Sequence, residues 1–346
     1  MPIDFELLKK LSDIPGPSGF EDDVRALIQK EIEPFVDRAF VDPMGNLIAI
    51  KGNHTDVLFD AHMDEVGFMI TGVMKDGSLH FHQIGSVPAG ILPGKRVLIG
   101  KNRIPGVIAS VPLHLQKDHI KSISYDALRI FIGAESEEEA VCRATVGDFA
   151  VFDTECKMIG TDDRTIAGRN MDDRLGCYLL IRLLQKKELT NCVCVFSVLE
   201  ESGCRGAAAA AEEIDFRYAV AIDTTSAANV PGVKAEDQVC ALRKGGALSF
   251  IDRMATYDNA LIREIYDHLI EQKIPIQAKG RNFGGTNASA YMKTGTGHYA
   301  LSLSTPALYI HGPLSVVAAE DICSMEDAMT SIFNLLSEKI QRKEGD

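Results

Sequence analysis

Four mostly apolar runs in this chain each end at a histidine or an acidic residue. They are residues 57–61 before His62, 193–199 before Glu200, 218–222 before Asp223 and 307–310 before His311. Short apolar runs bounded by polar residues predict buried strands of a parallel sheet. Because ligands of open α/β sheets bind outside the carboxyl ends of the strands, we expect these side chains to converge on one site.

A fifth acidic segment, Asp172-Asp173, immediately precedes a helical pattern. Taken alone, the pair is explained by an N-cap and a favourable interaction between the carboxylates and the helix dipole. A carboxylate that bridges two metal ions could occupy the same place. Two histidines and several carboxylates together suit a divalent metal ion of the Zn, Co or Mn type.

Each candidate residue taken alone is weaker evidence for a metal site than all of them together. His62 and Asp64 are two residues apart and share a face in an extended chain, so His62 could bind metal while Asp64 orients a ligand. Glu200 and Glu201 point in different directions, which would allow one to bind metal and the other to act as a general base. Asp223 could instead begin a turn, and His311 could be a hydrogen-bonded core histidine.

Composition excludes several classes of protein. With 346 residues the chain allows one large domain or two smaller ones, and 46% hydrophobic residues can form a large core. The net charge of −13 disfavours nucleic acid and anionic membranes as partners. The eight cysteines are dispersed without a CxxC pair, and we find neither a signal peptide nor an apolar run of membrane-spanning length. We therefore expect a cytoplasmic protein without disulfides.

The pattern along the chain predicts one α/β domain interrupted by a β-rich insert. Residues 5–34 predict two helices, the second beginning with a capping box of Ser18 and Glu21. Residues 71–162 lose helical periodicity and contain recurrent Gly and Pro, which predicts short antiparallel strands and a small barrel-like domain. Residues 1–70 and 163–346 would form the other domain. Its later elements are predicted as a helix from Asp172, strand 193–199, helix 204–213, strand 218–222, a strand near 247–251, helix 258–272, strands 298–304 and 307–310, and helix 321–340.

Several motifs resemble those of the M42 family of dinuclear metalloaminopeptidases, which includes glutamyl aminopeptidases and tetrahedral TET peptidases. The motifs are Pro15-Gly16-Pro17-Ser18-Gly19, Ala61-His62-Met63-Asp64-Glu65-Val66-Gly67-Phe68, Met171-Asp172-Asp173-Arg174-Leu175-Gly176, Glu200-Glu201-Ser202-Gly203-Cys204-Arg205-Gly206-Ala207, Asp223-Thr224-Thr225, Gly284-Gly285-Thr286 and Tyr309-Ile310-His311-Gly312-Pro313. They occur in the family's order over nearly the whole chain.

The resemblance implies a largely parallel mixed sheet flanked by helices, as in zinc peptidases, with an inserted small β-barrel-like domain. It implies two divalent metal ions per subunit, Zn or Co first and Mn as a further candidate. Asp172 would bridge them, with His62 and Asp223 completing one site and Glu201 and His311 the other. Glu200 would be the general base, and Asp64 would support the catalytic site.

The resemblance further implies release of N-terminal residues from short peptides by a two-metal activated water. It implies a homo-oligomer, at least a dimer and in some relatives a dodecamer, paired through the insert. The chain departs from the family pattern at Asn287, where Asp is usual, and at Leu308, where Arg is usual. A pocket role for Asn287 would place it beside the substrate amine.

The same sequence features allow other functions. A related metal-dependent deacylase or carboxypeptidase acting on small amides would use the same residues. An endoglucanase-type glycosidase is disfavoured because the chain has no Trp and only 7% aromatic residues for stacking on sugars, and because both histidines would lack a role. A non-catalytic assembly protein is disfavoured by the complete set of candidate ligands.

Overall fold

The computed structural model describes residues 3–112, 123–187, 189–280 and 284–344. The helices in this part of the chain are α1 (Phe5–Asp13), α2 (Asp22–Ile32), α3 (Glu137–Val141), α4 (Met171–Leu184), α5 (Arg205–Glu213), α6 (Asn259–Glu271), α7 (Ala288–Lys293) and α8 (Ala319–Glu344). The strands of the large sheet are β1 (Arg38–Val41), β2 (Leu47–Lys51), β3 (Val57–His62), β10 (Lys157–Ile159), β11 (Thr165–Gly168), β12 (Cys192–Ser197), β13 (Tyr218–Ser226), β14 (Gly246–Leu248), β15 (Ile276–Ala278), β16 (Tyr299–Leu308) and β17 (Ser315–Ala318).

The centre of the large sheet consists of the four parallel strands β12, β3, β13 and β16, in that order. Antiparallel strands extend the sheet at both edges, beyond β12 through β2 and beyond β16 through β17. β3 and β12 are buried along their whole length, because helices cover both faces of the sheet. The predicted fold class, a mixed and largely parallel sheet flanked by helices, is confirmed.

The helices form two layers. On one face α4 packs against β3 and β13 and is itself covered by α1, α2 and α8. On the other face α5 and α7 pack against β12 and β13. Every residue of α4 is buried, including Arg174, so the helix has no solvent-facing polar stripe. The start of this helix therefore lies inside the molecule, next to the carboxyl ends of the central strands.

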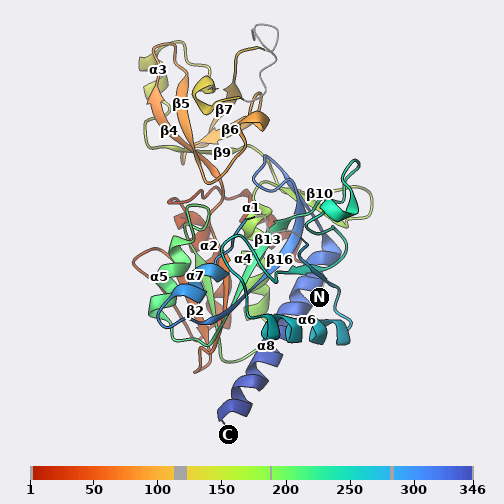
Figure 1. Ribbon diagram of the computed structural model, residues 1–346. Helices are drawn as coiled ribbons and strands as arrows, with labels where there is room; N and C mark the ends of the chain where they lie inside the picture. Colours follow the sequence, from red (N-terminus) through yellow and green to blue (C-terminus); the bar gives the residue numbers. More distant parts are fainter. Residues whose placement is uncertain (1–2, 113–122, 188, 281–283, 345–346) are drawn as a thin grey trace.

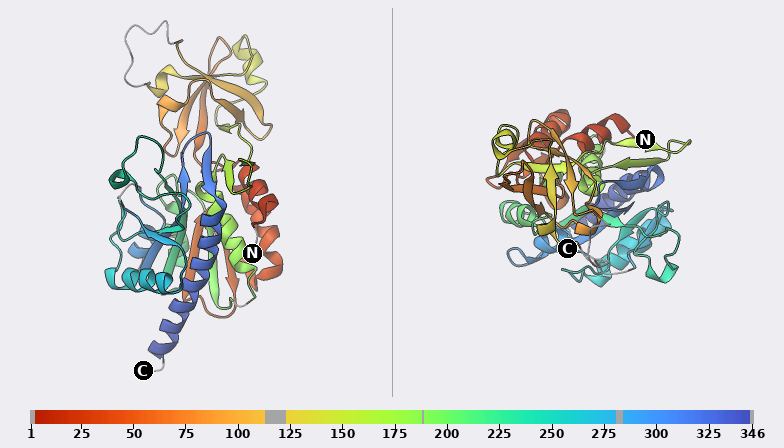
Figure 2. Two further views of the ribbon diagram at one scale, coloured as in Figure 1. Left: turned by 90° about the vertical axis from the view of Figure 1, so that its right-hand side faces the viewer. Right: turned by 90° about the horizontal axis from the view of Figure 1, so that it is seen from above.

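A separate closed barrel is formed by β4 (Gly67–Val73), β5 (Leu79–Ile84), β6 (Arg96–Ile99), β7 (Ile104–Ala109), β8 (Arg129–Phe131) and β9 (Phe149–Phe152). It has its own apolar core, which includes Phe68, Phe81 and Phe152. The barrel lies at one end of the molecule, and the last turns of α8 project from the opposite end (Figures 1 and 2). The barrel-like insert is thus present, while the division into domains at residues 71 and 162 stays a prediction. Residues 113–122 of that insert lie outside the described residues.

Two predictions at the level of single elements were wrong. The two strands predicted at 298–304 and 307–310 are one continuous strand, β16, which spans Tyr299–Leu308. On the side of β16 that faces away from β13, the paired strand changes from β14 to β17 at Pro306. Because neither strand pairs with β16 at this residue, the missing N–H of the proline costs no hydrogen bond of the sheet. The capping box of Ser18 and Glu21 does not form, because the Ser18 hydroxyl donates a hydrogen bond to Asp64 instead.

The eight cysteines are free, as the sequence predicts. Cys192 and Cys194 are buried in β12. Among the described residues, none of the helices combines the length and apolar character that a membrane crossing requires.

Candidate metal centre

The predicted site residues come together at the carboxyl ends of the central strands. His62 is the last residue of β3, Glu200 and Glu201 follow β12, and Asp223 lies within β13. His311 follows β16, and Asp172 lies at the start of α4. Because β12, β3, β13 and β16 are parallel neighbours, their ends meet at one edge. An open cleft of about 310 Å³ is lined there by Asp172, Glu200, Glu201, Asp223 and His311.

Asp172 lies between the two histidines. Its Oδ1 is 3.3 Å from Nε2 of His62, and its Oδ2 is 3.2 Å from Nε2 of His311. Glu201 Oε1 is 3.3 Å from the same His311 nitrogen. Each oxygen of the Asp172 carboxylate therefore faces a different histidine, which is the arrangement that a bridging carboxylate requires.

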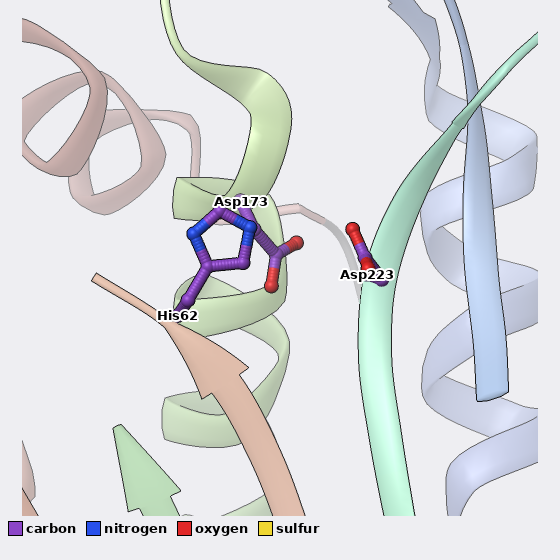
Figure 3. A group of neighbouring side chains, drawn as sticks. All are labelled: His62, Asp173 and Asp223. Atoms are coloured by element: carbon purple, nitrogen blue, oxygen red, sulfur yellow. The ribbon is translucent and has the colours of Figure 1, made fainter. Parts of the chain in front are cut away.

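Candidate ligand atoms form two overlapping groups within 4.8 Å of one another. One contains His62, Asp172 and Glu201, and the other contains His62, Asp173 and Asp223. Figure 3 shows the second group, with the Asp173 carboxylate from α4 between the His62 ring and the Asp223 side chain. Asp173 was not predicted as a ligand, because in the sequence it was explained by a helix N-terminus.

Asp173 does more than cap a helix. Its Oδ1 accepts a hydrogen bond of 3.0 Å from the Gly176 N–H. Its Oδ2 is buried, and the described part of the chain offers it no hydrogen-bond partner. An unsatisfied buried carboxylate oxygen is costly in the absence of a cation.

Asp64 fixes the position of the two glutamates. Its Oδ1 accepts a hydrogen bond of 3.0 Å from the Glu200 N–H, and its Oδ2 accepts one of 3.1 Å from the Glu201 N–H. The Ser18 hydroxyl donates to the same Oδ2 at 2.6 Å. Asp64 also supplies a backbone carbonyl 3.0 Å from Nδ1 of His62, which leaves Nε2 directed at Asp172. Asp64 thus contacts three of the candidate functional residues, the two glutamates through its carboxylate and His62 through its backbone carbonyl.

A second buried ionic cluster supports the segment after β3. Arg169 Nε donates to Glu65 Oε2 at 2.7 Å. The fully buried Arg174 guanidinium donates to the backbone carbonyls of Met63, Leu11 and Ile14. These bonds hold α4, the N-terminal segment and the end of β3 in a fixed arrangement, so the ligand positions do not depend on flexible loops.

The buried carboxylates of the cluster are costly to ionise without a neighbouring positive charge. Burial, together with the charge of Asp172, raises the pKa of Asp223 to about 8. Burial also raises the pKa of Glu200 and of Asp173 well above the usual range, and neighbouring carboxylates add to the effect.

The histidines respond in the opposite sense. Burial opposes the charge of His311, but hydrogen bonds to Asp172 and Glu201 outweigh it and raise its pKa to about 11. Protons on His62 and His311 thus partly balance the acids. Divalent cations can replace such protons, because metal binding to His and carboxylate ligands releases them. The donor set of imidazole nitrogens and carboxylate oxygens fits ions of the Zn, Co or Mn type.

Asn287 and Leu308 do not lie where a substrate-contacting role would place them. Asn287 is 3% exposed and donates hydrogen bonds to Asp60 Oδ1 at 2.7 Å and Ser197 Oγ at 2.9 Å. It therefore belongs to the packing behind β3 and is not among the residues that line the cleft, where a position beside the substrate amine would place it. Leu308 packs against a small apolar cluster that includes Ala227 and Cys240.

Comparison with known proteins identifies the family of the chain. The family model described as M42 glutamyl aminopeptidase matches residues 45–327. The chain is 31% identical to the lysyl aminopeptidase of Pyrococcus furiosus over 335 residues, which covers 92% of this chain and 94% of the relative. The match spans more than half of the chain, so the protein belongs to the M42 family of peptidases.

Solved structures place the chain in the same family. The TET1 peptidase of Pyrococcus horikoshii, described as assembling into a tetrahedron or a large octahedral shell, superposes with a TM-score of 0.82 at 33% identity, covering 94% of this chain and 98% of that chain. A Thermotoga maritima protein described as an endoglucanase superposes with a TM-score of 0.77 at 31% identity, covering 95% and 98%.

Proposed function

We propose that the protein is a metal-dependent aminopeptidase that releases N-terminal residues from short peptides. The observation that carries the proposal is the Asp172 carboxylate, whose two oxygens lie 3.3 Å from His62 Nε2 and 3.2 Å from His311 Nε2. Membership of the M42 family supports the same reaction.

Two divalent ions, Zn or Co first and Mn as a further candidate, fit the donor set. His62, Asp172 and Asp223 would hold one ion, and Asp172, Glu201 and His311 the other. Asp173, which lies in a group with His62 and Asp223, is an additional candidate ligand or close support for the first ion. When bound, such ions polarise a scissile carbonyl and acidify a water molecule.

Glu200 is our candidate for the residue that moves the proton. It lines the cleft, its Oε2 is 3.9 Å from His62 Nε2, and its backbone N–H is held by Asp64. Without metal ions, burial raises the pKa of its carboxyl group, and the negative charges of Asp223 and Glu201 add to the effect. A carboxylate at this position could act as a general base. Glu200 would take the proton of the attacking water and deliver it to the leaving amine.

Two other reactions share parts of this site. A metal-dependent deacylase or carboxypeptidase of small amides would use the same ligands and the same base. One similar solved structure is described as an endoglucanase. A glycosidase would have to use carboxylates that here lie within 3.3 Å of histidine nitrogens. The sequence also has no Trp, the usual residue on which sugar rings stack.

A panel of fluorogenic aminoacyl amides, N-acylated amides and carboxymethylcellulose, each with added Zn²⁺, Co²⁺ or Mn²⁺, separates these reactions. The proposal predicts hydrolysis of the substrates with a free α-amine only. Hydrolysis confined to the N-acylated amides would favour the deacylase, and release of reducing sugar would favour the glycosidase.

We also propose that the chain forms a homo-oligomer through the inserted barrel, with a dimer as the minimum and a dodecamer as the larger form. The proposal is supported by exposed apolar side chains on neighbouring barrel strands. Val107 of β7 and Phe131 of β8 are cross-strand neighbours and are 40% and 54% exposed. The TET1 relative, which assembles into shells, agrees with this.

A further inference from the structure

Two histidines of the barrel, His80 and His82, lie outside the candidate metal centre and have no part in the proposed reaction. Both belong to β5, which pairs with β4 in the barrel wall (Figure 1). Leu79 and Phe81 of the same strand belong to the apolar core of the barrel. Because side chains alternate along a strand, His80 and His82 share the outer face. The two histidines are therefore neighbours on one surface of the barrel.

The two imidazole rings are already close together. Their centroids are 5.6 Å apart, and the ring planes are inclined by 72°. A zinc ion lies about 2.0–2.1 Å from an imidazole nitrogen, which puts the centroids of two rings on one ion about 4.5–6 Å apart. The observed separation lies in that range. One ion can therefore contact both rings after small rotations of the two side chains, without movement of the strand.

The hydrogen bonds of the pair leave ring nitrogens available to an ion. Nδ1 of His80 is 2.8 Å from Oγ1 of Thr71 in β4. A histidine that binds metal usually donates its other ring N–H to an oxygen atom, which fixes the tautomer. When His80 donates to Thr71 in this way, its Nε2 is the free donor atom. His82 is exposed, and neither of its ring nitrogens is hydrogen-bonded to the described part of the chain.

We propose that His80 and His82 together bind a divalent transition-metal ion, at a site separate from the candidate metal centre. Imidazole nitrogens suit zinc, copper and nickel, whereas magnesium and calcium are bound through oxygen atoms. Water molecules complete the coordination of the ion, since His82 is open to solvent. Cu²⁺ binds a given nitrogen site most tightly among the divalent ions of the first transition row, so Cu²⁺ is the most sensitive probe.

Equilibrium dialysis of the full-length, chelator-treated protein against glycine-buffered Cu²⁺, followed by elemental analysis, counts the ions bound per subunit. The wild type is compared with His80→Ala, His82→Ala and the double variant. All of these proteins keep the residues of the candidate metal centre, so ions bound there cancel in the comparison. His54→Ala is the control, because it removes an exposed histidine from the turn between β2 and β3.

The wild type is expected to bind one more Cu²⁺ per subunit than the double variant, and His54→Ala should match the wild type. Loss of a hydrogen-bond partner of a ligand typically costs about 10- to 100-fold in metal affinity. Loss of a ligand itself should cost no less, so each single variant should raise the Kd of this Cu²⁺ ion at least about tenfold.

Equal numbers of bound ions and equal Kd values in the wild type and the double variant would overturn the inference. A loss of Cu²⁺ in His54→Ala as large as that in the double variant would also overturn it, because any exposed histidine would then suffice. Should His80→Ala fail to fold, His82→Ala at its exposed position still decides the question, and an unchanged Kd in that variant rejects the site. These results do not depend on the proposed aminopeptidase function, because no hydrolysis is measured.

Discussion

The carboxylate of Asp64 accepts the backbone N–H groups of Glu200 and Glu201, one on each oxygen, at 3.0 and 3.1 Å. Asp64, two positions after the candidate ligand His62, thereby holds the backbone of both glutamates at the end of the neighbouring strand β12. The proposed base and the proposed ligand are thus adjacent in the chain and are held by the same group.

Asp64→Asn should lower kcat while the protein remains folded. The amide can keep one acceptor oxygen, but its N–H₂ group would face an N–H donor, so one of the two glutamates loses its support. Loss of such supporting bonds typically costs about 10- to 100-fold in activity or metal affinity. Steady-state kinetics and elemental analysis measure both quantities. Ser18→Ala, which removes only the hydroxyl donor, should have a smaller effect, and equal losses in the two variants would contradict this role of Asp64.

Asn287→Asp should destabilise the protein rather than change its KM. The substitution places a second carboxylate 2.7 Å from Asp60 Oδ1, where the Asn287 N–H₂ group now donates. Burial already raises the pKa of Asp60 to about 6. Two buried carboxylates bind protons more tightly in the folded state than in the unfolded state. The loss of stability should therefore grow as the pH rises from 5 to 7.

The expected loss at pH 7 is about 1–3 kcal/mol, the cost of an unsatisfied buried polar group. Urea unfolding at pH 5 and pH 7 measures it. Wild-type stability of the variant at both pH values would contradict this packing role of Asn287. A changed KM with unchanged stability would favour a role in substrate binding instead.

Metal ions should stabilise the fold as well as support turnover. A ligand that binds only the folded state adds about 2.7 kcal/mol when present at 100 times its Kd. We expect Zn²⁺, Co²⁺ or Mn²⁺ to raise the Tm of chelator-treated protein by several degrees, and Mg²⁺ to do so less, because imidazole ligands favour the first group. The rise should be smaller in His62→Ala, which removes one proposed ligand of the first ion and leaves the proposed ligands of the second. A rise of equal size in that variant would place the binding elsewhere.

Phe131→Lys should reduce the size of the assembly. The side chain is 54% exposed on β8 of the barrel, where a partner surface would bury it. Light scattering is expected to show a smaller species than wild type. Met44→Lys is the control, because Met44 is 43% exposed in the turn between β1 and β2, away from the barrel. A wild-type monomer at micromolar concentration with full peptidase activity would refute the assembly proposal.

The sequence predicted the parts of the site that repeat a local pattern. His62, Glu200, Asp223 and His311 each follow or end an apolar strand, and parallel neighbours bring such ends together whatever the detailed packing. A small barrel-like domain of short antiparallel strands was predicted because residues 71–162 lose helical periodicity while Gly and Pro recur.

Features that depend on long-range contacts could not be predicted. Ser18 has the local signature of a cap, but its hydroxyl bonds to Asp64, 46 positions away. Asp173 has the signature of a helix N-terminus, and only the packing of α4 under β13 reveals its buried, unpartnered oxygen.

Glu201→Ala separates the ligand role from the role of the base. Glu201 Oε1 is 3.3 Å from His311 Nε2, and removal of this carboxylate takes away one proposed ligand of the second ion. Metal content per subunit should fall, and turnover should fall with it. Unchanged metal content by elemental analysis would refute the assignment of Glu201.

The proposed role of Glu200 as general base is tested by measuring kcat and metal content together on Glu200→Gln. Gln keeps the size of Glu200 and cannot take up a proton, while the candidate metal ligands remain. We predict wild-type metal content and a loss of kcat of at least about 10²–10⁴-fold, the usual contribution of a general base. A variant that holds its metal and turns over aminoacyl substrates at close to the wild-type rate would contradict it.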